Sequence, residues 1–428
     1  MAPSTGSVVS SSSSAAQVQR ATLFVSNLGG NTERQEWGPV GVSRPPEGKL
    51  MTLHVLVLGA GFGGLELATR LSELLADQVR VTLIDRNDSF FFGFSKLDVL
   101  FGKRTPDDVR LPYAALTRPG VDFHQEEITA IDPENRHVRT RSGSYQADVL
   151  VVALGAEYDT EATPGFAEDG FEYYTLGGAE RLRDALPAFQ GGKIVISVLG
   201  EPYKCPPAPF EAAFLLEDYF AGRGLRDQVS ITVTGYMGAP VPVAKEVSEP
   251  LQQHLTARGI TFMGNRTVSR LDPERKFAEF AEGEGVPYDL FIGIPVHRVP
   301  AVIADSGLAP DGWIPVEKTN LATRFPGVYA IGDVAAAYTA KAGLFAERAA
   351  QFVADDIVAN LRGTAAPPPY DGAGDCYMEF GRGEVGKVQV NFLSGPKPTG
   401  SLIGPSAEIA DEKAEFARSR KERWFGDG

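Results

Sequence analysis

The chain is poor in cysteine and histidine. Cys205 and Cys376 are the only cysteines among 428 residues, and there are five histidines. Two distant thiols cannot build the disulfide framework of a small secreted domain, and they are too few to ligate an iron–sulfur cluster. The histidines, His124 and His297 included, have no metal-ligand spacing to cysteines or acids. We therefore predict core or surface roles for them and no metal site.

The sequence also lacks an excess of positive charge and any long apolar run. The formal net charge is −14, which argues against a nucleic-acid partner because such proteins need a basic face. No stretch of about 18 apolar residues is present, so no transmembrane helix is expected. Apolar residues make up 43% of the chain, as in ordinary globular domains. We therefore expect a cytoplasmic protein.

Residues 1–50 lack the features of a signal peptide. They contain a serine run at 10–14, and no apolar core follows their first positive charge, Arg20. This irregular composition predicts a disordered leader. Met51 directly precedes the first strong strand, so a natural start at Met51 is a further hypothesis. The intact mass of the natural protein would test it.

Glycine is missing where a second nucleotide-binding loop would need it. Residues 194–199 are typical of a buried strand, and residues 212–220 are typical of an apolar helix. Between them the pattern G-x-G-x-x-G would require glycine at 200, 202 and 205, but Pro202 and Cys205 take the last two places. We interpret Cys205 as a thiol at a helix N-terminus, where its pKa is expected to be lowered and its nucleophilicity raised.

The complete glycine pattern occurs earlier in the chain. Residues 54–58 predict a strand, residues 65–75 a helix and residues 79–85 a second strand. In this fingerprint the glycines make the turn, admit a pyrophosphate and let the helix pack on the strand, while an acid accepts hydrogen bonds from a ribose. The expected nucleotide-binding residues are Gly59, Gly61, Phe62, Gly63, Gly64 and Asp85.

Two later segments return to the same nucleotide site. Residues 147–155 predict an apolar strand, and Ala153 and Gly155 lie at its end. Residues 323–333 predict another strand with Gly332-Asp333 at its end, which is followed by a helix near 344–361. Residues 121–145 predict a short β-meander. We therefore predict an α/β fold with two Rossmann-like domains, the second inserted into the first. The predicted boundaries are 51–170 and 301–365 for the first domain, 171–300 for the degenerate second one, and 366–428 for a small C-terminal α+β region.

The C-terminal region predicts an alternating strand at 387–392 and a polar helix at 406–425. Ile409, Phe416 and Trp424 form one loose apolar face of that helix. Its basic residues are Lys413, Arg418, Arg420, Lys421 and Arg423. Two interpretations stay open. The helix packs on its own domain or on a second subunit of a homodimer, or it makes peripheral contact with the inner face of a membrane.

Together these motifs resemble a known family. The 59–64 loop with Asp85, the 153–155 strand end and Gly332-Asp333 look like the FAD-binding motifs of the two-dinucleotide-fold flavoprotein disulfide reductases. Within that superfamily, the 205–211 motif Cys-Pro-Pro-Ala-Pro-Phe-Glu resembles the sulfide:quinone oxidoreductase and flavocytochrome c sulfide dehydrogenase branch. So do Lys341-Ala-Gly and Gly-Asp-Cys376-Tyr, and we interpret the segment around Cys376 as a glycine-rich turn. The resemblance covers about residues 51–425.

The resemblance implies an FAD-dependent oxidoreductase that takes electrons from sulfide or another small sulfur compound and passes them to a quinone or other acceptor. Asp333 would bond the flavin ribitol, and Cys205 and Cys376 would form a redox pair beside the isoalloxazine. Lys341 would help the reduced flavin or the quinone carry negative charge. Glu211 would move protons, because its apolar neighbours are expected to raise its pKa. Quinone-reducing members commonly have a third active-site cysteine near the 153–155 strand end, and this chain has none there.

Two other functions stay open from the sequence. A nicotinamide-dependent dehydrogenase, such as a type II NADH dehydrogenase, shares the fold and the FAD site. Glu201, Pro202 and Cys205 oppose it, because bulk and negative charge stand where a pyrophosphate needs glycine. A flavin redox sensor or an electron-transfer subunit is the other alternative, since a negative surface suits docking to a basic cytochrome.

Overall fold

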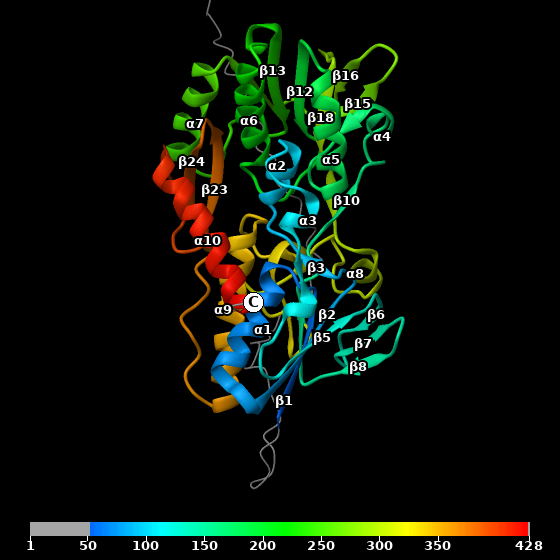
Figure 1. Cartoon of the computed structure of the whole chain (residues 1–428). Helices are drawn as coiled ribbons and strands as arrows, with labels where there is room; N and C mark the ends of the chain where they lie inside the picture. The colour runs from blue at the N-terminus through cyan, green and yellow to red at the C-terminus, as the bar shows by residue number, and fades with distance from the viewer. Residues whose placement is uncertain (1–51, 427–428) are drawn as a thin grey trace, which may run out of the picture. The chain divides into compact units, whose positions relative to one another are not determined.

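A five-stranded parallel sheet forms the first unit of the computed structural model, which describes residues 52–426 (Figure 1). The leader expected at 1–50 lies outside the described residues. From edge to edge the strands are β21 (Val328–Ala330), β9 (Val149–Val152), β1 (Leu53–Leu58), β2 (Val79–Asp85) and β5 (Val121–Gln125). β21 pairs with β9 although a second sheet comes between them in the chain, so the first unit is built from two separate stretches.

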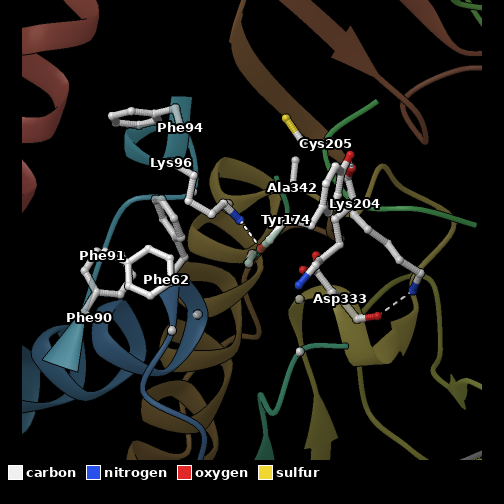
Figure 2. Close-up of a pocket in the computed structure, with 18 of the residues that line it drawn as sticks. Phe62, Phe90, Phe91, Phe94, Lys96, Tyr174, Lys204, Cys205, Asp333 and Ala342 are labelled. Carbon is white, nitrogen blue, oxygen red and sulfur yellow. Dashed lines mark hydrogen bonds between the residues drawn. The ribbon is translucent and has the colours of Figure 1, made fainter. Parts of the chain in front are cut away.

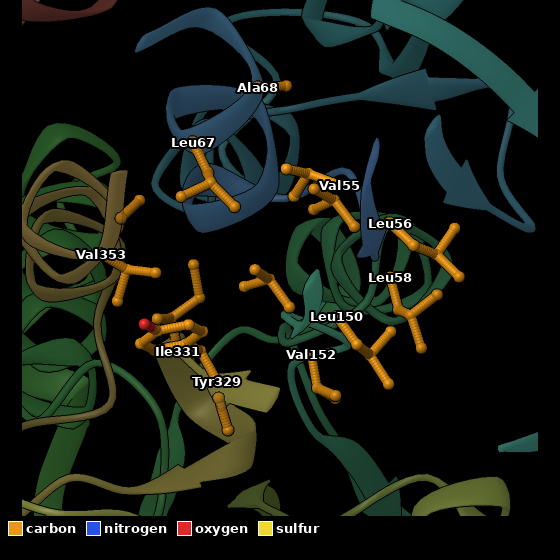
Figure 3. Packing of buried hydrophobic residues seen from close by; sticks show 14 of the residues in the cluster. Val55, Leu56, Leu58, Leu67, Ala68, Leu150, Val152, Tyr329, Ile331 and Val353 are labelled. Atoms are coloured by element: carbon orange, nitrogen blue, oxygen red, sulfur yellow. The ribbon is translucent and has the colours of Figure 1, made fainter. Parts of the chain in front are cut away.

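Four of the five strands in this sheet are buried along most of their length, whereas the edge strand β5 is only partly buried. β1 is fully buried except at His54, which is partly exposed. α1 (Phe62–Leu75) and α9 (Gly343–Arg362) lie side by side, and Leu67 and Val353 form one apolar layer with Ile331 (Figure 3). The helix predicted to start at residue 65 begins one turn earlier, because Gly63 and Gly64 are accommodated inside it.

A second parallel sheet repeats the design. Its strands are β11 (Gly170–Phe171), β18 (Leu290–Ile294), β12 (Gly192–Val198), β13 (Val229–Gly235) and β14 (Ile260–Gly264), in that order. The longer helices of this unit are α5 (Leu176–Ala185), α6 (Ala208–Gly222) and α7 (Lys245–Ala257). α6 is buried over most of its surface because it packs on β12 and β13 and also on a strand of the C-terminal region.

Each parallel sheet carries one antiparallel meander. These are β6 (Ile128–Asp132), β7 (His137–Thr140) and β8 (Ser144–Gln146) in the first unit, and β15 (Val268–Asp272), β16 (Phe277–Phe280) and β17 (Gly285–Pro287) in the second. The meander predicted at 121–145 was therefore placed too early. β5 belongs to the parallel sheet, where it pairs with β2, and the meander begins after it.

The C-terminal region is a three-stranded antiparallel sheet followed by a helix. Its elements are β23 (Ala373–Gly381), β24 (Glu384–Asn391), β25 (Thr399–Ser406) and α10 (Ala407–Phe425). Cys376 was expected in a glycine-rich turn, but it lies within β23, paired with Val388 of β24. The neighbouring glycines are accommodated in the strand, and β23 packs between α6 and α9.

The terminal helix α10 docks on the chain's own first unit (Figure 1). Its predicted apolar face is buried, and Trp424 is 0% exposed. The Trp424 Nε1 atom and the Arg423 guanidinium donate to the buried Glu66 carboxylate of α1 at 2.9 Å, and Arg420 pairs with Glu347 of α9 at 2.7 Å. The own-domain interpretation is therefore the one that the structure supports.

Shorter elements complete the described part of the chain. They are β3 (Ser89–Phe90), β4 (Leu111–Pro112), β10 (Glu157–Asp159), β19 (Val296–Arg298), β20 (Ile314–Pro315), β22 (Ala335–Ala336), α2 (Ser95–Leu100), α3 (Pro106–Val109), α4 (Phe166–Asp169), α8 (Ala301–Asp305) and the 3₁₀ turns η1 (Ala76–Gln78), η2 (Tyr113–Ala115), η3 (Leu186–Ala188), η4 (Arg226–Gln228) and η5 (Gly332–Val334). Within residues 52–426, none of the helices combines the length and apolarity that crossing a bilayer requires.

Candidate active site

The structure brings the predicted site residues together around one cavity of about 690 Å³. The cavity lies at the carboxyl ends of parallel strands, where ligands bind in open α/β sheets. Of the predicted residues, Gly64 alone does not line it. Those that do are Gly59, Gly61, Phe62, Gly63, Asp85, Ala153, Gly155, Cys205, Glu211, Gly332, Asp333, Lys341 and Cys376.

The first glycine loop is a tight turn with one open side. Gly59 has a φ of +99°, and a Cβ there would stand 2.4 Å from the Ala153 carbonyl oxygen. A Cβ on Gly64 would stand 1.9 Å from the Gly59 oxygen, so Gly64 keeps α1 close to the turn and stays away from the cavity. A Cβ on Gly61 would meet no protein atom within 4 Å. The open side therefore faces the N-terminus of α1, where backbone amides favour a phosphate.

The Asp85 carboxylate holds this loop in place. One oxygen accepts a hydrogen bond from the Ala60 amide at 2.8 Å, and the other accepts from the Asn87 amide at 2.9 Å. Asp85 therefore ties the glycine turn to the residues that follow β2. It also lines the cavity, and its contact with a ribose stays a prediction.

Cys205 lies in a long loop, not at the start of a helix. β12 ends at Val198 and α6 begins at Ala208, so Cys205 precedes the helix by three residues. Its φ is +55°, a left-handed conformation that non-glycine residues seldom adopt. The Cys205 amide donates to the Lys341 carbonyl oxygen at 2.7 Å, which pins the loop against the segment before α9.

The expected lowering of the Cys205 pKa is wrong. Burial raises the pKa of the thiol well above its usual value, and the nearby Glu211 carboxylate and Cys376 raise it further. The Lys96 ammonium and the Ala208 amide at the start of α6 lower the pKa of Cys205, but their effects are smaller than that of burial. Cys205 is therefore more stable as a thiol than as an isolated thiolate.

Cys376 and Glu211 complete the cysteine end of the cavity. Both cysteines are partly buried free thiols. Burial raises the pKa of Cys376 to about 12. Glu211 is 2% exposed, and its Oε2 atom lies 3.9 Å from the Cys205 sulfur, in the orientation of a thiol donating to a carboxylate. Burial raises the pKa of Glu211 to about 7, a value suited to taking up and releasing protons near neutral pH.

The Lys341 ammonium is held by backbone oxygens and an indole ring. It donates to the carbonyl oxygens of Asp333 at 2.6 Å and Ala335 at 3.0 Å, and lies 3.7 Å from the Trp313 ring centroid. Burial lowers the pKa of Lys341 to about 8. Because its carbonyl also accepts from Cys205, the residue connects η5 to the cysteine loop. Its predicted role in stabilising negative charge stays a prediction.

Two further lysines line the cavity and were missed from the sequence. Lys96 of α2 donates to the Tyr174 carbonyl oxygen at 2.7 Å, and burial lowers its pKa. The Lys204 ammonium lies 4.5 Å from the Tyr158 ring centroid. Figure 2 shows Lys96 beside the aromatic residues of the 90–94 run, with Lys204 and Cys205 across from it. Both lysines supply local positive charge in an acidic chain. The sequence feature that could have identified Lys96 is a single lysine just after the aromatic run at 90–94.

His297 is a buried residue that contacts the loop before Cys205. Its Nδ1 atom contacts the Pro295 carbonyl oxygen at 2.7 Å, and its Nε2 atom accepts from the Lys204 amide at 3.2 Å. Burial and the neighbouring Lys204 lower the pKa of His297 to about 3. The ring is therefore neutral and helps to position the loop that precedes Cys205.

Comparison with known proteins agrees with this geometry. The model of the pyridine nucleotide-disulphide oxidoreductase family matches residues 53–200 and 217–353. The mitochondrial sulfide:quinone oxidoreductase of Mus musculus is 27% identical over 367 residues, which are 81% of this chain and 80% of that protein. A type II NADH:quinone oxidoreductase of Staphylococcus aureus is 34% identical over 130 residues, 30% of this chain.

The fold is shared with a solved structure of the first of these enzyme types. The sulfide:quinone oxidoreductase of Aquifex aeolicus superposes with a TM-score of 0.75 at 22% identity, covering 87% of this chain and 92% of that one. The chain therefore belongs to the pyridine nucleotide-disulphide oxidoreductase family. It is an FAD-dependent oxidoreductase that resembles sulfide:quinone oxidoreductases.

The cavity residues fit FAD. The open space at Gly61 leaves room for a pyrophosphate against the α1 N-terminus, and the positive φ values of Gly155 and Gly332 let the backbone turn close to the cavity. Gly61, Asp85 and Asp333 are the residues that we expect to hold the diphosphate, the adenosine ribose and the ribitol.

Proposed function

We propose that this protein oxidises sulfide, or a small thiol or persulfide, with Cys205 and Cys376 as a redox pair, and passes two electrons through FAD to a quinone. One observation carries the proposal. The chain's two cysteines, remote in sequence, line the same cavity as the nucleotide-binding glycine loop, with the buried Glu211 beside Cys205. The similarity to sulfide:quinone oxidoreductases along most of the chain supports it.

The proposed cycle starts from a disulfide between the two cysteines. A hydrosulfide ion attacks one sulfur, the bond between the cysteines breaks, and the products are a cysteine persulfide and a cysteine thiolate. A second hydrosulfide ion removes the outer sulfur as a hydropersulfide and leaves a thiol. Oxidation of the thiol–thiolate pair back to the disulfide releases two electrons and one proton. Bound FAD would accept the electrons and a quinone would reoxidise it.

The chain's own residues prepare the reactants. Burial disfavours a lone thiolate at Cys205, so the pair is poised to return to the disulfide once electrons can leave. Glu211 receives the released proton, since its carboxylate already faces the Cys205 sulfur. Lys96 and Lys204 attract the hydrosulfide ion, because a cation in a poorly solvated cavity raises the local anion concentration.

Anaerobic mixing with sulfide tests the proposal. We expect the native protein's flavin absorbance to bleach, and the Cys205→Ser and Cys376→Ser variants to lose bleaching by at least about 100-fold in rate. Dithionite should bleach all three proteins equally, which controls for bound FAD. Bleaching that persists in Cys205→Ser, or is absent in the native protein, would contradict the proposal.

An NADH:quinone reductase is the second candidate, because part of the chain is similar to type II enzymes. The second loop argues against this function, since Pro202 and Cys205 replace two of the glycines that a pyrophosphate needs, and the exposed Glu201 adds negative charge. Rapid bleaching by NADH would favour this function over sulfide oxidation. Steady turnover of sulfide with quinone alone would exclude the remaining alternative, a flavin sensor or electron-transfer subunit.

A further inference from the structure

The cysteine site is connected to the terminal helix through one strand. Glu211 accepts a hydrogen bond at its Oε1 atom from the Glu379 amide of β23 at 3.1 Å, while its Oε2 atom faces Cys205. The side chain of the same Glu379 forms an ion pair with Lys413 of α10. Lys413, near the C-terminus, is thus connected to the Cys205 sulfur through three successive contacts.

The Glu379–Lys413 pair is itself shielded from solvent. The two side chains are 16% and 11% exposed, and the Lys413 ammonium lies 4.8 Å from the Phe94 ring centroid, close to the cavity wall. Charges interact more strongly in such surroundings than at an open surface. Lys413 is therefore placed to act on Glu211, unlike the exposed Lys421 on the same helix.

Several ionisable groups act on Glu211, and the largest charge effect among them comes from the Lys413 cation. The groups that act on it, or on which it acts, from the packed elements are Cys205 before α6, Cys376 and Glu379 on β23, Tyr173 after β11 and Lys413 on α10. Lys413 favours the carboxylate form of Glu211, whereas the Glu379 carboxylate disfavours it. Burial is the larger effect and favours the neutral form.

We propose that Lys413, held by Glu379, is a positioning residue of the cysteine site, which stabilises the Glu211 carboxylate that takes the proton released at Cys205 and Cys376. The inference rests on the proposed function and extends it. The terminal helix would then do more than cover the first unit. It would help to set the charge of the proton acceptor.

Removing either charge of the Glu379–Lys413 pair tests the proposal. The two substitutions should shift the pKa of Glu211 in opposite directions, which a purely structural role of the pair does not predict. Lys413→Met removes the cation and frees the Glu379 charge, so we expect the pKa of Glu211 to rise by about one unit. Glu379→Gln keeps the backbone amide and frees Lys413, so we expect the pKa to fall by a similar amount. Lys413→Arg and Lys421→Met should leave it near the native value.

The measurement is an infrared pH titration of the carboxyl band of the FAD-loaded protein, with Glu211→Gln identifying the band by difference. Shifts in opposite directions support the proposal. Shifts in the same direction, or none, overturn it, and flavin absorbance reports whether each variant is folded. Sulfide bleaching is followed in the same samples. If the native protein does not bleach but the band still shifts as expected, the sulfide function fails while the Lys413 assignment stands.

Discussion

The two strand–helix loops of the molecule begin alike and end differently. In the first unit three residues separate β1 from α1, whereas in the second unit nine separate β12 from α6. The third glycine of the first loop, Gly64, lies inside its helix and has no room for a side chain. Cys205, at the same spacing from Gly200, lies outside its helix and faces the cavity. Equal sequence spacing therefore does not mean equal structural position.

The length of each loop decides which groups it presents to the cavity. A short loop presents helix amides to a phosphate, because the helix starts directly after the turn. A long loop moves the helix start away and presents a side chain instead. The Cys205 amide is pinned by the Lys341 carbonyl, and that contact with the first unit fixes where the sulfur lies.

The largest expected effect is the loss of stability on adding a side chain at Gly64, in the first loop. Gly64→Ala puts a methyl group against the Gly59 carbonyl oxygen, a backbone atom that cannot swing away. We expect a loss of more than about 3 kcal/mol in the free energy of unfolding, together with loss of bound FAD. Urea unfolding followed by circular dichroism measures it.

Gly222→Ala, at the end of α6, is the matched control, because a Cβ there meets no atom within 4 Å. It should leave stability unchanged or raise it by up to about 1 kcal/mol. An equal loss in both variants would contradict the packing role of Gly64.

A smaller effect is the pH dependence of stability that arises from Glu211, in the helix α6 that follows the second loop. The pKa of Glu211 is about 7 in the folded protein against an ordinary 4.5, so the folded state binds more protons between these values. Stability from this group is therefore present at low pH and is lost as pH rises toward 7 and beyond. Relative to the native protein, Glu211→Gln should gain about 2–3 kcal/mol between pH 5 and pH 8.

Urea unfolding at the two pH values measures this change. Glu201→Gln, an exposed carboxyl in the same loop, is the control and should follow the native pH profile. A flat difference between Glu211→Gln and the native protein would show that Glu211 is charged throughout the range.

The smallest expected effect tests whether the second loop is a damaged copy of the first. Cys205→Gly suits the φ of +55° and relieves backbone strain, but it gives up a partly buried thiol, so stability should change by less than about 1 kcal/mol. Because the loop still has nine residues, we expect no flavin bleaching by NADH and no bleaching by sulfide. Bleaching by NADH in this variant would show that the cysteine alone blocks the nucleotide.

Much of the fold could be predicted from the sequence because its buried elements carry strong patterns. The strand at 79–85, the helix near 344–361 and the terminal helix occur within one residue of their predicted bounds. The errors arose where a contact decided the outcome. β5 joined the parallel sheet because β2 offered an unpaired edge, and Cys376 joined β23 because β24 pairs with it.

The chemistry of the site divides in the same way. The sequence by itself determined the FAD fingerprint and the apolar setting of Glu211, because these follow from residue types at short spacing, and it singled out Cys205 and Cys376 as the chain's two cysteines. Only the tertiary structure decided that Cys205 lies outside its helix with a raised pKa, that Lys96 and Lys204 line the cavity, and that Lys413 pairs with Glu379. Burial and the arrangement of distant charges set these properties, and neither can be read along a single segment of chain.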